Sequence, residues 1–262
     1  MPTTTRDGAT IAYGVDGPDD GPAVLLYHGT TMDRLAWDMV IAALPAGHGL
    51  RFVKPEFPGS GESPMPTGPL TVEQLADDGI AVLDELRVDR FHVAGYSLGA
   101  VVAAATAARA ADRVLSATLL CGWARSDPRM VFTFELWKRL IEADPALFMR
   151  YAVADGFTSG AIGALWDGLE DVVALGATAI APGSAAQLDL DKVLDITPLL
   201  GTITAPTLVI GAADDRWVDV SHSHALAAAI PTATLEVLPA GHVVIQQLAG
   251  DVARLLHGRI TG

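Results

Sequence analysis

A serine, a histidine and an aspartate in this sequence have the residue types that acyl transfer requires. Ser97 lies at the centre of Gly95–Gly99, whose sequence is Gly-Tyr-Ser-Leu-Gly. An apolar run precedes this segment and a helical pattern follows it, so a sharp strand-to-helix turn is expected there. In such a turn the serine adopts an uncommon backbone conformation and its hydroxyl stands clear of the sheet. We interpret Ser97 as a candidate nucleophile, and an ordinary capping serine is the alternative.

A serine hydroxyl needs a base, and the base needs an acid that orients it. His242 follows a predicted strand, begins the last predicted helix and comes after Ser97, which is the order that this turn motif requires. The acid is expected on the loop after the strand at 206–210, where Asp214 and Asp215 both stand. The residues themselves leave these two aspartates as alternatives.

Acyl transfer also needs hydrogen-bond donors for the oxyanion of the tetrahedral intermediate. The backbone N–H of Leu98, the residue after Ser97, is one candidate because the helix that follows starts with free N–H groups. The second donor is expected on the loop after the strand that ends near His28, where Thr30 is the natural choice. Both assignments concern backbone atoms, so they depend on the fold.

Short apolar runs alternate with helical patterns along the chain, and this alternation predicts a mostly parallel sheet with helices on both faces. The runs at 23–27, 114–120 and 206–210 are continuous, as expected for strands buried on both sides. A hairpin is expected around Asp7-Gly8. Helices are expected at 34–44, 71–86, 100–111, 220–230 and 243–256.

The segment 122–190 differs because it is rich in aromatic residues and its periodicity is helical. We predict that it forms a helical cap, while residues 1–121 and 191–262 form the core. Ligands bind at the carboxyl ends of the strands in such sheets, where this insertion begins. Its aromatics either form its own core or line a substrate pocket. The pocket is predicted to include His28, Tyr96, Trp123, Phe134, Trp137 and Trp166.

The composition argues against some classes of binding partner. The net charge of −14 argues against binding to nucleic acid or to an anionic membrane surface. The single cysteine, Cys121, cannot form an internal disulfide, and the first residues lack the apolar core of a secretory signal. We expect a cytoplasmic protein that acts on a small molecule, and its oligomeric state stays open.

No metal or cofactor is expected. His222 and His224 are two residues apart on a predicted helix, so their side chains face different directions and make a poor metal pair. The chemistry of a serine, a histidine and an aspartate needs neither a metal nor an organic cofactor.

Five short motifs follow one another in order: His28-Gly29-Thr30, Pro58-Gly59-Ser60-Gly61-Glu62-Ser63, Gly95-Tyr96-Ser97-Leu98-Gly99, Pro206-Thr207-Leu208-Val209-Ile210 with Asp215, and Gly241-His242. Together they resemble the α/β-hydrolase superfamily over essentially the full chain. The subgroup likeness is to small bacterial esterases, lactonases and cofactor-free haloperoxidase-like hydrolases. The chain departs from the family at Glu56, where aspartate is frequent, and at Asp219, where proline is frequent.

The resemblance implies an eight-stranded α/β-hydrolase sheet with a helical cap that shapes the pocket. It also implies Ser97 as nucleophile and His242 as base. Because the family acid falls five residues past the strand isoleucine, Ile210, the resemblance favours Asp215 over Asp214. The oxyanion donors it implies are the N–H groups of Thr30 and Leu98.

The function expected is a serine hydrolase that cleaves a small carboxylic ester or lactone through an acyl-enzyme. Two other readings stay open. The same fold can serve non-hydrolytic chemistry, such as C–C bond cleavage, acyl transfer, lyase or cyclisation steps. A ligand-binding protein on this scaffold is a third reading, because a fold does not fix a function.

Overall fold

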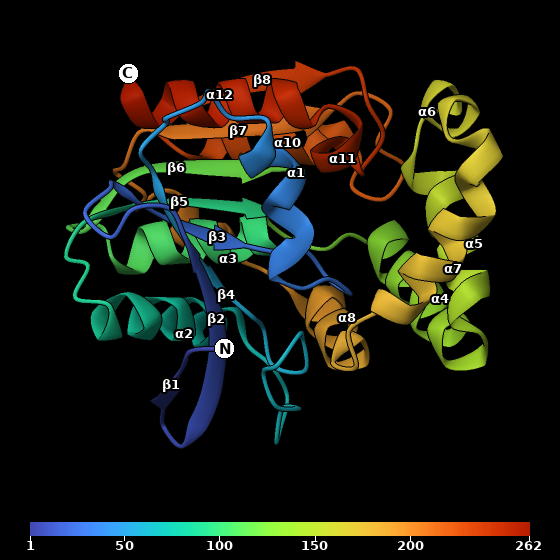
Figure 1. The fold of residues 1–262 in the computed structure, drawn as a ribbon, viewed down its shortest axis with the longest axis horizontal. Coiled ribbons are helices and arrows are strands. Elements are labelled where there is room, and N and C mark those ends of the chain that lie inside the picture. The colour runs from blue at the N-terminus through green and yellow to red at the C-terminus, as the bar shows by residue number, and fades with distance from the viewer.

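A computed structural model describes residues 1–262 and contains one eight-stranded sheet in the order β1-β2-β4-β3-β5-β6-β7-β8 (Figure 1). The pairs β1–β2 and β2–β4 are antiparallel, and all the other neighbours are parallel. The mostly parallel sheet and the hairpin at Asp7-Gly8 are therefore confirmed. The strands are β1 (Thr3–Arg6), β2 (Ala9–Asp16), β3 (Ala23–Tyr27), β4 (Arg51–Pro55), β5 (Phe91–Tyr96), β6 (Val114–Leu120), β7 (Thr207–Ala212) and β8 (Ala233–Leu238).

Helices cover both faces of the sheet. Alternate residues of β3 show this, because Leu25 and Tyr27 pack in one hydrophobic cluster while Val24 and Leu26 pack in the other. The first cluster includes α2, α3 and α10, and the second includes α1, α11 and α12. The bounds are η1 (Arg34–Trp37), α1 (Asp38–Ala42), α2 (Val72–Glu85), α3 (Leu98–Arg109), α9 (Thr197–Leu200), α10 (Val220–Ala229), α11 (Val244–Gln247) and α12 (Ala249–Thr261).

Two expected helices differ from the prediction. The segment 34–44 begins as the 3₁₀ turn η1, where the Asp33 carboxylate accepts a hydrogen bond from the Leu35 N–H at 2.8 Å, and only then continues as α1. The segment 243–256 is interrupted at Leu248, whose φ of −131° and ψ of 43° are not helical. The closing helix is therefore two helices, α11 and α12. No helix in the structure is both long and apolar enough to span a membrane.

Between β6 and β7 the chain forms a group of helices. They are α4 (Pro128–Ala143), α5 (Pro145–Gly156), α6 (Ser159–Ala164), η2 (Trp166–Gly168), α7 (Leu169–Ala179) and α8 (Ser184–Val193). Figure 1 shows α4 to α7 beyond the carboxyl ends of the parallel strands, while α8 lies nearer the sheet. The Asp144 carboxylate caps α5 and Pro145 occupies its first turn. The expected boundary at residue 190 falls inside α8.

Candidate active site

The turn from β5 into α3 presents Ser97. Its φ of 57° and ψ of −123° lie outside the backbone conformations that residues other than glycine ordinarily adopt. The turn is tight, because a Cβ on Gly95 would lie 1.9 Å from the Gly99 carbonyl oxygen and a Cβ on Gly99 would lie 2.4 Å from that of Tyr27. Only glycine fits at both positions. The local sequence therefore produces the turn that makes the Ser97 hydroxyl available.

Ser97, His242 and Asp215 form one hydrogen-bonded chain. The His242 ring lies between the other two, with Nε2 at 3.0 Å from Ser97 Oγ and Nδ1 at 2.6 Å from Asp215 Oδ2. Asp215 Oδ1 accepts hydrogen bonds from the backbone N–H groups of Trp217 at 2.9 Å and Val218 at 2.8 Å. Asp215 and His242 are buried and Ser97 is partly accessible. In this arrangement His242 Nε2 can accept the proton of Ser97 Oγ, and the Asp215 carboxylate can stabilise the resulting imidazolium.

Asp214, the alternative acid, lies on the same loop but faces solvent. It is exposed, and no hydrogen bond joins its carboxylate to His242. Its backbone N–H donates to the Ala240 carbonyl at 2.9 Å, and the next residue, Asp215, is buried. Of the two aspartates that the sequence leaves open, the structure places only Asp215 beside His242.

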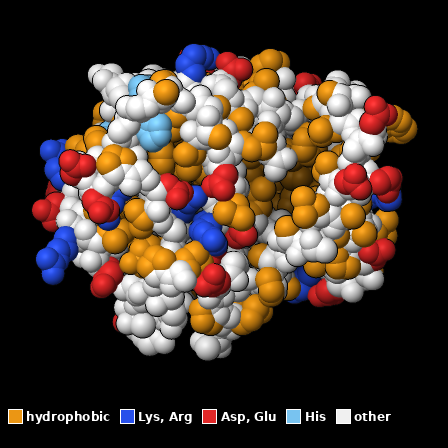
Figure 2. Space-filling view, in the orientation of Figure 1, with side chains coloured by type: hydrophobic (Ala, Val, Ile, Leu, Met, Phe, Trp, Pro, Cys, Tyr) orange, Lys and Arg blue, Asp and Glu red, His pale blue; other side chains and the backbone are white.

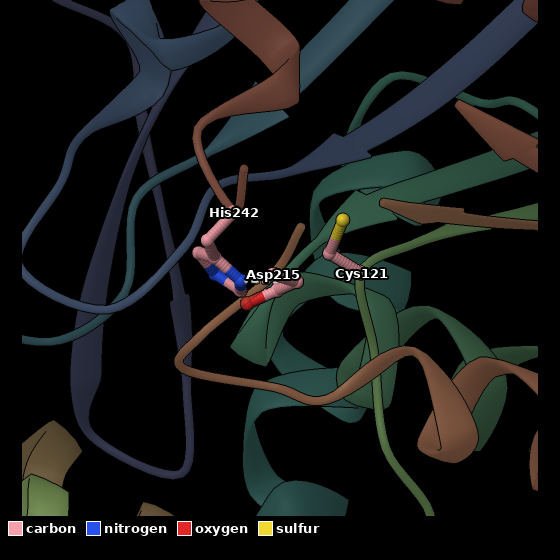
Figure 3. Close-up of side chains that lie close together, drawn as sticks. All are labelled: Cys121, Asp215 and His242. Carbon is pink, nitrogen blue, oxygen red and sulfur yellow. Dashed lines mark hydrogen bonds and ion pairs between the residues drawn. The ribbon is translucent and has the colours of Figure 1, made fainter. Parts of the chain in front are cut away.

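Cys121 lies next to this pair, and the three side chains could in principle surround a metal ion (Figure 3). Their ligand atoms lie within 4.8 Å of one another. However, His242 Nδ1 is already hydrogen bonded to Asp215, and both Asp215 oxygens have donors. Burial raises the pKa of the Cys121 thiol well above its usual range, so the side chain beside the pair is a neutral thiol. These contacts favour a hydrogen-bonded histidine–aspartate pair over a metal site.

Two backbone N–H groups close to Ser97 are free of partners. Leu98 is the first residue of α3, so its N–H has no acceptor within the helix. The N–H of Thr30 has no hydrogen-bond partner within the protein. The loop that carries it passes close to the serine turn, because a Cβ on Gly29 would lie 3.3 Å from Ser97 Cβ. Both predicted oxyanion donors are therefore near the candidate nucleophile.

His28 is fully buried and joins two loops. Its Nδ1 is 2.8 Å from the Gly29 carbonyl oxygen, and its Nε2 accepts a hydrogen bond from the Phe57 N–H at 3.1 Å. Burial lowers the pKa of His28 to about 4, so the ring is neutral at pH 7. The prediction that His28 lines the pocket is wrong, because His28 is not among the residues that line the cavity beside Ser97.

A cavity of about 420 Å³ opens beside Ser97 and His242. Figure 2 shows it as a hollow surrounded by hydrophobic side chains, between the sheet and the helices of the insertion. Tyr96 and Trp137 line it as predicted. Trp123, Phe134 and Trp166 are not among its lining residues, so these three predictions are wrong. Trp123 and Phe134 instead pack on each other, with ring centroids 5.8 Å apart, in the main hydrophobic cluster. Trp166 is 69% exposed to solvent.

Sequence reasoning missed several residues of the cavity. They come from η1, α5, α7 and the loop after Asp215, and include Leu35, Phe148, Met149, Leu175 and Trp217. The sequence offers one indication for Trp217, since it follows the candidate acid by two residues. It offers none for Leu35 and Leu175, because their position at the cavity depends on how the insertion folds back over the sheet.

Comparisons with known proteins identify the family and the fold. A model of the alpha/beta hydrolase family matches residues 23–255. A pyrrolizixenacetamide deacetylase of Xenorhabdus hominickii is 32% identical over 239 residues, which cover 90% of this chain and 88% of the relative. A putative carbamate hydrolase RutD of Variovorax paradoxus is 31% identical over 238 residues, with 88% of each protein covered. The crystal structure of the enol-lactonase from Burkholderia xenovorans LB400 covers 100% of both chains with a TM-score of 0.87 and 24% identity.

The eight-stranded sheet with a serine turn at the end of β5 is an α/β-hydrolase fold, which the enol-lactonase structure shares over its whole length. The chain belongs to the alpha/beta hydrolase family, as the family model and the relatives show. The resemblance found in the sequence is confirmed, and so is the expectation that the protein is an enzyme of this fold.

The buried His28 gives a prediction on stability. Its pKa of about 4 in the folded protein lies below its ordinary value of 6.5, so between these values the unfolded chain binds more protons. The free energy of unfolding should therefore fall as the pH drops from about 6.5 to 4, by up to about 3 kcal/mol from this residue. Urea unfolding across this range should show a smaller pH dependence in His28→Gln.

The control for this measurement is His224→Gln, because His224 is an exposed histidine. Its curve should keep the pH dependence of the unmodified protein. An unchanged pH dependence in His28→Gln would show that His28 is not the group responsible.

Proposed function

We propose that the protein is a serine hydrolase that cleaves a carboxylic ester or lactone through an acyl-enzyme. The observation that carries the proposal is the continuous chain of hydrogen bonds from Ser97 Oγ through His242 to Asp215. In this mechanism His242 Nε2 takes the hydroxyl proton while Ser97 Oγ attacks the carbonyl carbon. The negative charge then develops on the carbonyl oxygen, where the N–H groups of Thr30 and Leu98 stabilise it.

Collapse of the tetrahedral intermediate breaks the bond to the leaving oxygen, and His242 gives its proton to that oxygen. A water molecule then attacks the acyl-enzyme while His242 accepts a proton from it. When the second tetrahedral intermediate collapses, the bond from the acyl carbon to Ser97 Oγ breaks and the carboxylic acid leaves. His242 gives its proton to Ser97 Oγ, which restores the hydroxyl. Asp215 holds the ring with Nδ1 protonated and stabilises the imidazolium in both halves.

The cavity supports a neutral and mainly apolar substrate. Most of its lining is hydrophobic, and it includes no lysine or arginine. Asp33 is the only acidic residue among those that line the cavity. Arg125, Arg129 and Arg150 do not line it, and Arg150 is paired with Glu170 on the surface. A substrate carboxylate would lose its hydration there without gaining a cation.

The two neighbouring aspartates provide a matched test of the mechanism. Asp215→Asn should lower kcat by about 10⁴-fold, because the amide no longer holds the protonated Nδ1 in place. Asp214→Asn should keep kcat, because Asp214 is exposed and does not contact His242. Steady-state hydrolysis of p-nitrophenyl butyrate measures both, and Ser97→Ala should show no turnover. Full activity in Ser97→Ala or Asp215→Asn would exclude this mechanism.

The absence of a cation in the cavity gives a prediction on substrates. p-Nitrophenyl butyrate and p-nitrophenyl hemisuccinate have the same leaving group and acyl chains of similar length, but only the second carries a carboxylate. The kcat/KM of the charged ester should be about 100-fold lower, which corresponds to about 3 kcal/mol of uncompensated desolvation. Equal values, or a preference for the hemisuccinate, would contradict this substrate class.

A further inference from the structure

Helix α8 buries two polar side chains one turn apart. Gln187 and Asp191 are separated by four residues, so they lie on the same face of the helix. Both are 0% exposed. Burying an amide and a carboxyl group is costly unless each finds hydrogen-bond partners, so the partners show what this face does.

The partners are consecutive residues of the loop that carries the candidate oxyanion donor. Thr31 donates its backbone N–H to Gln187 Oε1 at 3.0 Å, and Thr30 donates its hydroxyl to Asp191 Oδ2 at 2.6 Å. Gln187 also donates from Nε2 to Ser60 Oγ at 2.9 Å. A further bond runs from the Ala181 N–H, just before α8, to the Thr31 carbonyl at 3.0 Å.

Thr31 shows why such contacts are needed. Its φ is 70°, which is a strained value for a β-branched residue. Strained backbone of this kind persists only where the surroundings determine it, and it occurs frequently at functional sites. Both backbone hydrogen-bonding groups of Thr31 are held from the segment that leads into and forms α8. The loop conformation therefore depends on the insertion as well as on the sheet.

We propose that Gln187 and Asp191 are positioning residues that hold the Thr30 N–H where the oxyanion forms. This inference rests on the function proposed above. Asp191 holds the side-chain hydroxyl of Thr30, and Gln187 holds the backbone N–H of the next residue, Thr31. The helical insertion thus acts on the reaction itself, in addition to shaping the cavity.

The protonation of Asp191 determines which substitutions preserve the contact. Burial raises the pKa of Asp191 to about 8, and no basic side chain pairs with it. Its second oxygen, Oδ1, has no hydrogen-bond partner. At pH 7 the side chain is therefore mainly a neutral carboxylic acid. An asparagine has the same shape and can accept the Thr30 hydroxyl through its amide oxygen, whereas valine removes the acceptor.

The experiment compares Asp191→Val, Asp191→Asn and Thr30→Val in hydrolysis of p-nitrophenyl butyrate. Thr30→Val removes the same hydrogen bond without a substitution in α8, and residue 30 still carries its backbone N–H. In both valine variants kcat should fall about 10- to 100-fold with KM changed less than about threefold, because a displaced donor affects the transition state. Asp191→Asn should stay within about threefold of the unmodified kcat.

A second readout separates positioning from folding stability. A boronic acid that forms a tetrahedral adduct on Ser97 should bind the two valine variants more weakly, by a factor that follows the loss in kcat. Asp189→Asn is the control, since Asp189 lies on the same helix but is exposed and paired with Lys138. It should change neither kcat nor boronic acid affinity.

The outcomes distinguish this inference from the function on which it rests. If the unmodified protein is active, Ser97→Ala is inactive and both valine variants keep kcat, then only the positioning role is wrong. A lowered melting temperature with unchanged kcat would show a purely structural contact. If Asp191→Val does not fold, Thr30→Val decides alone. If Ser97→Ala keeps full activity, the proposed function fails and this inference fails with it.

Discussion

The close approach of β5, α3 and the loop after β3 is the constraint on which the rest of the site depends. There is no room for a Cβ at Gly95 or Gly99, so the chain reverses within a few residues and Ser97 takes up its strained conformation. β5 lies in the middle of the sheet, between β3 and β6, and is buried along its whole length. A rigid central strand can hold such a turn, whereas an exposed edge strand could relax it.

The other groups of the site meet at this turn because parallel strands end at the same edge of a sheet. The loops after β3, β7 and β8 bring Thr30, Asp215 and His242 to Ser97 from three distant parts of the chain. Side chains and backbone then fix these loops. Asp215 is held by two backbone N–H groups, His28 joins two loops as a neutral ring, and α8 holds the loop of Thr30. These hydrogen bonds hold the loops that carry the candidate catalytic groups, which suits a preorganised reaction centre.

The sequence predicts the parts of the site that follow local rules. A Gly-x-Ser-x-Gly turn is recognisable from its own residues, and the strand before it is recognisable as an apolar run. The residues alone do not separate Asp215 from Asp214, because the direction of each side chain depends on how the loop after β7 folds against distant residues such as Ala240. The pocket was predicted least well. Trp123 and Phe134 turned inward while Trp166 turned outward, and these directions depend on how several helices pack together. The same applies to Gln187 and Asp191, which a helical pattern places on one face without showing what that face meets.

The central claim is that Ser97 is an activated nucleophile. Its most direct test is the intact mass of the folded protein after treatment with a fluorophosphonate, followed by peptide mapping. The account predicts a single adduct, located on Ser97, that does not form in His242→Ala under the same conditions, because the serine then lacks its base. No adduct on the folded protein, or an adduct on another residue, would contradict the account.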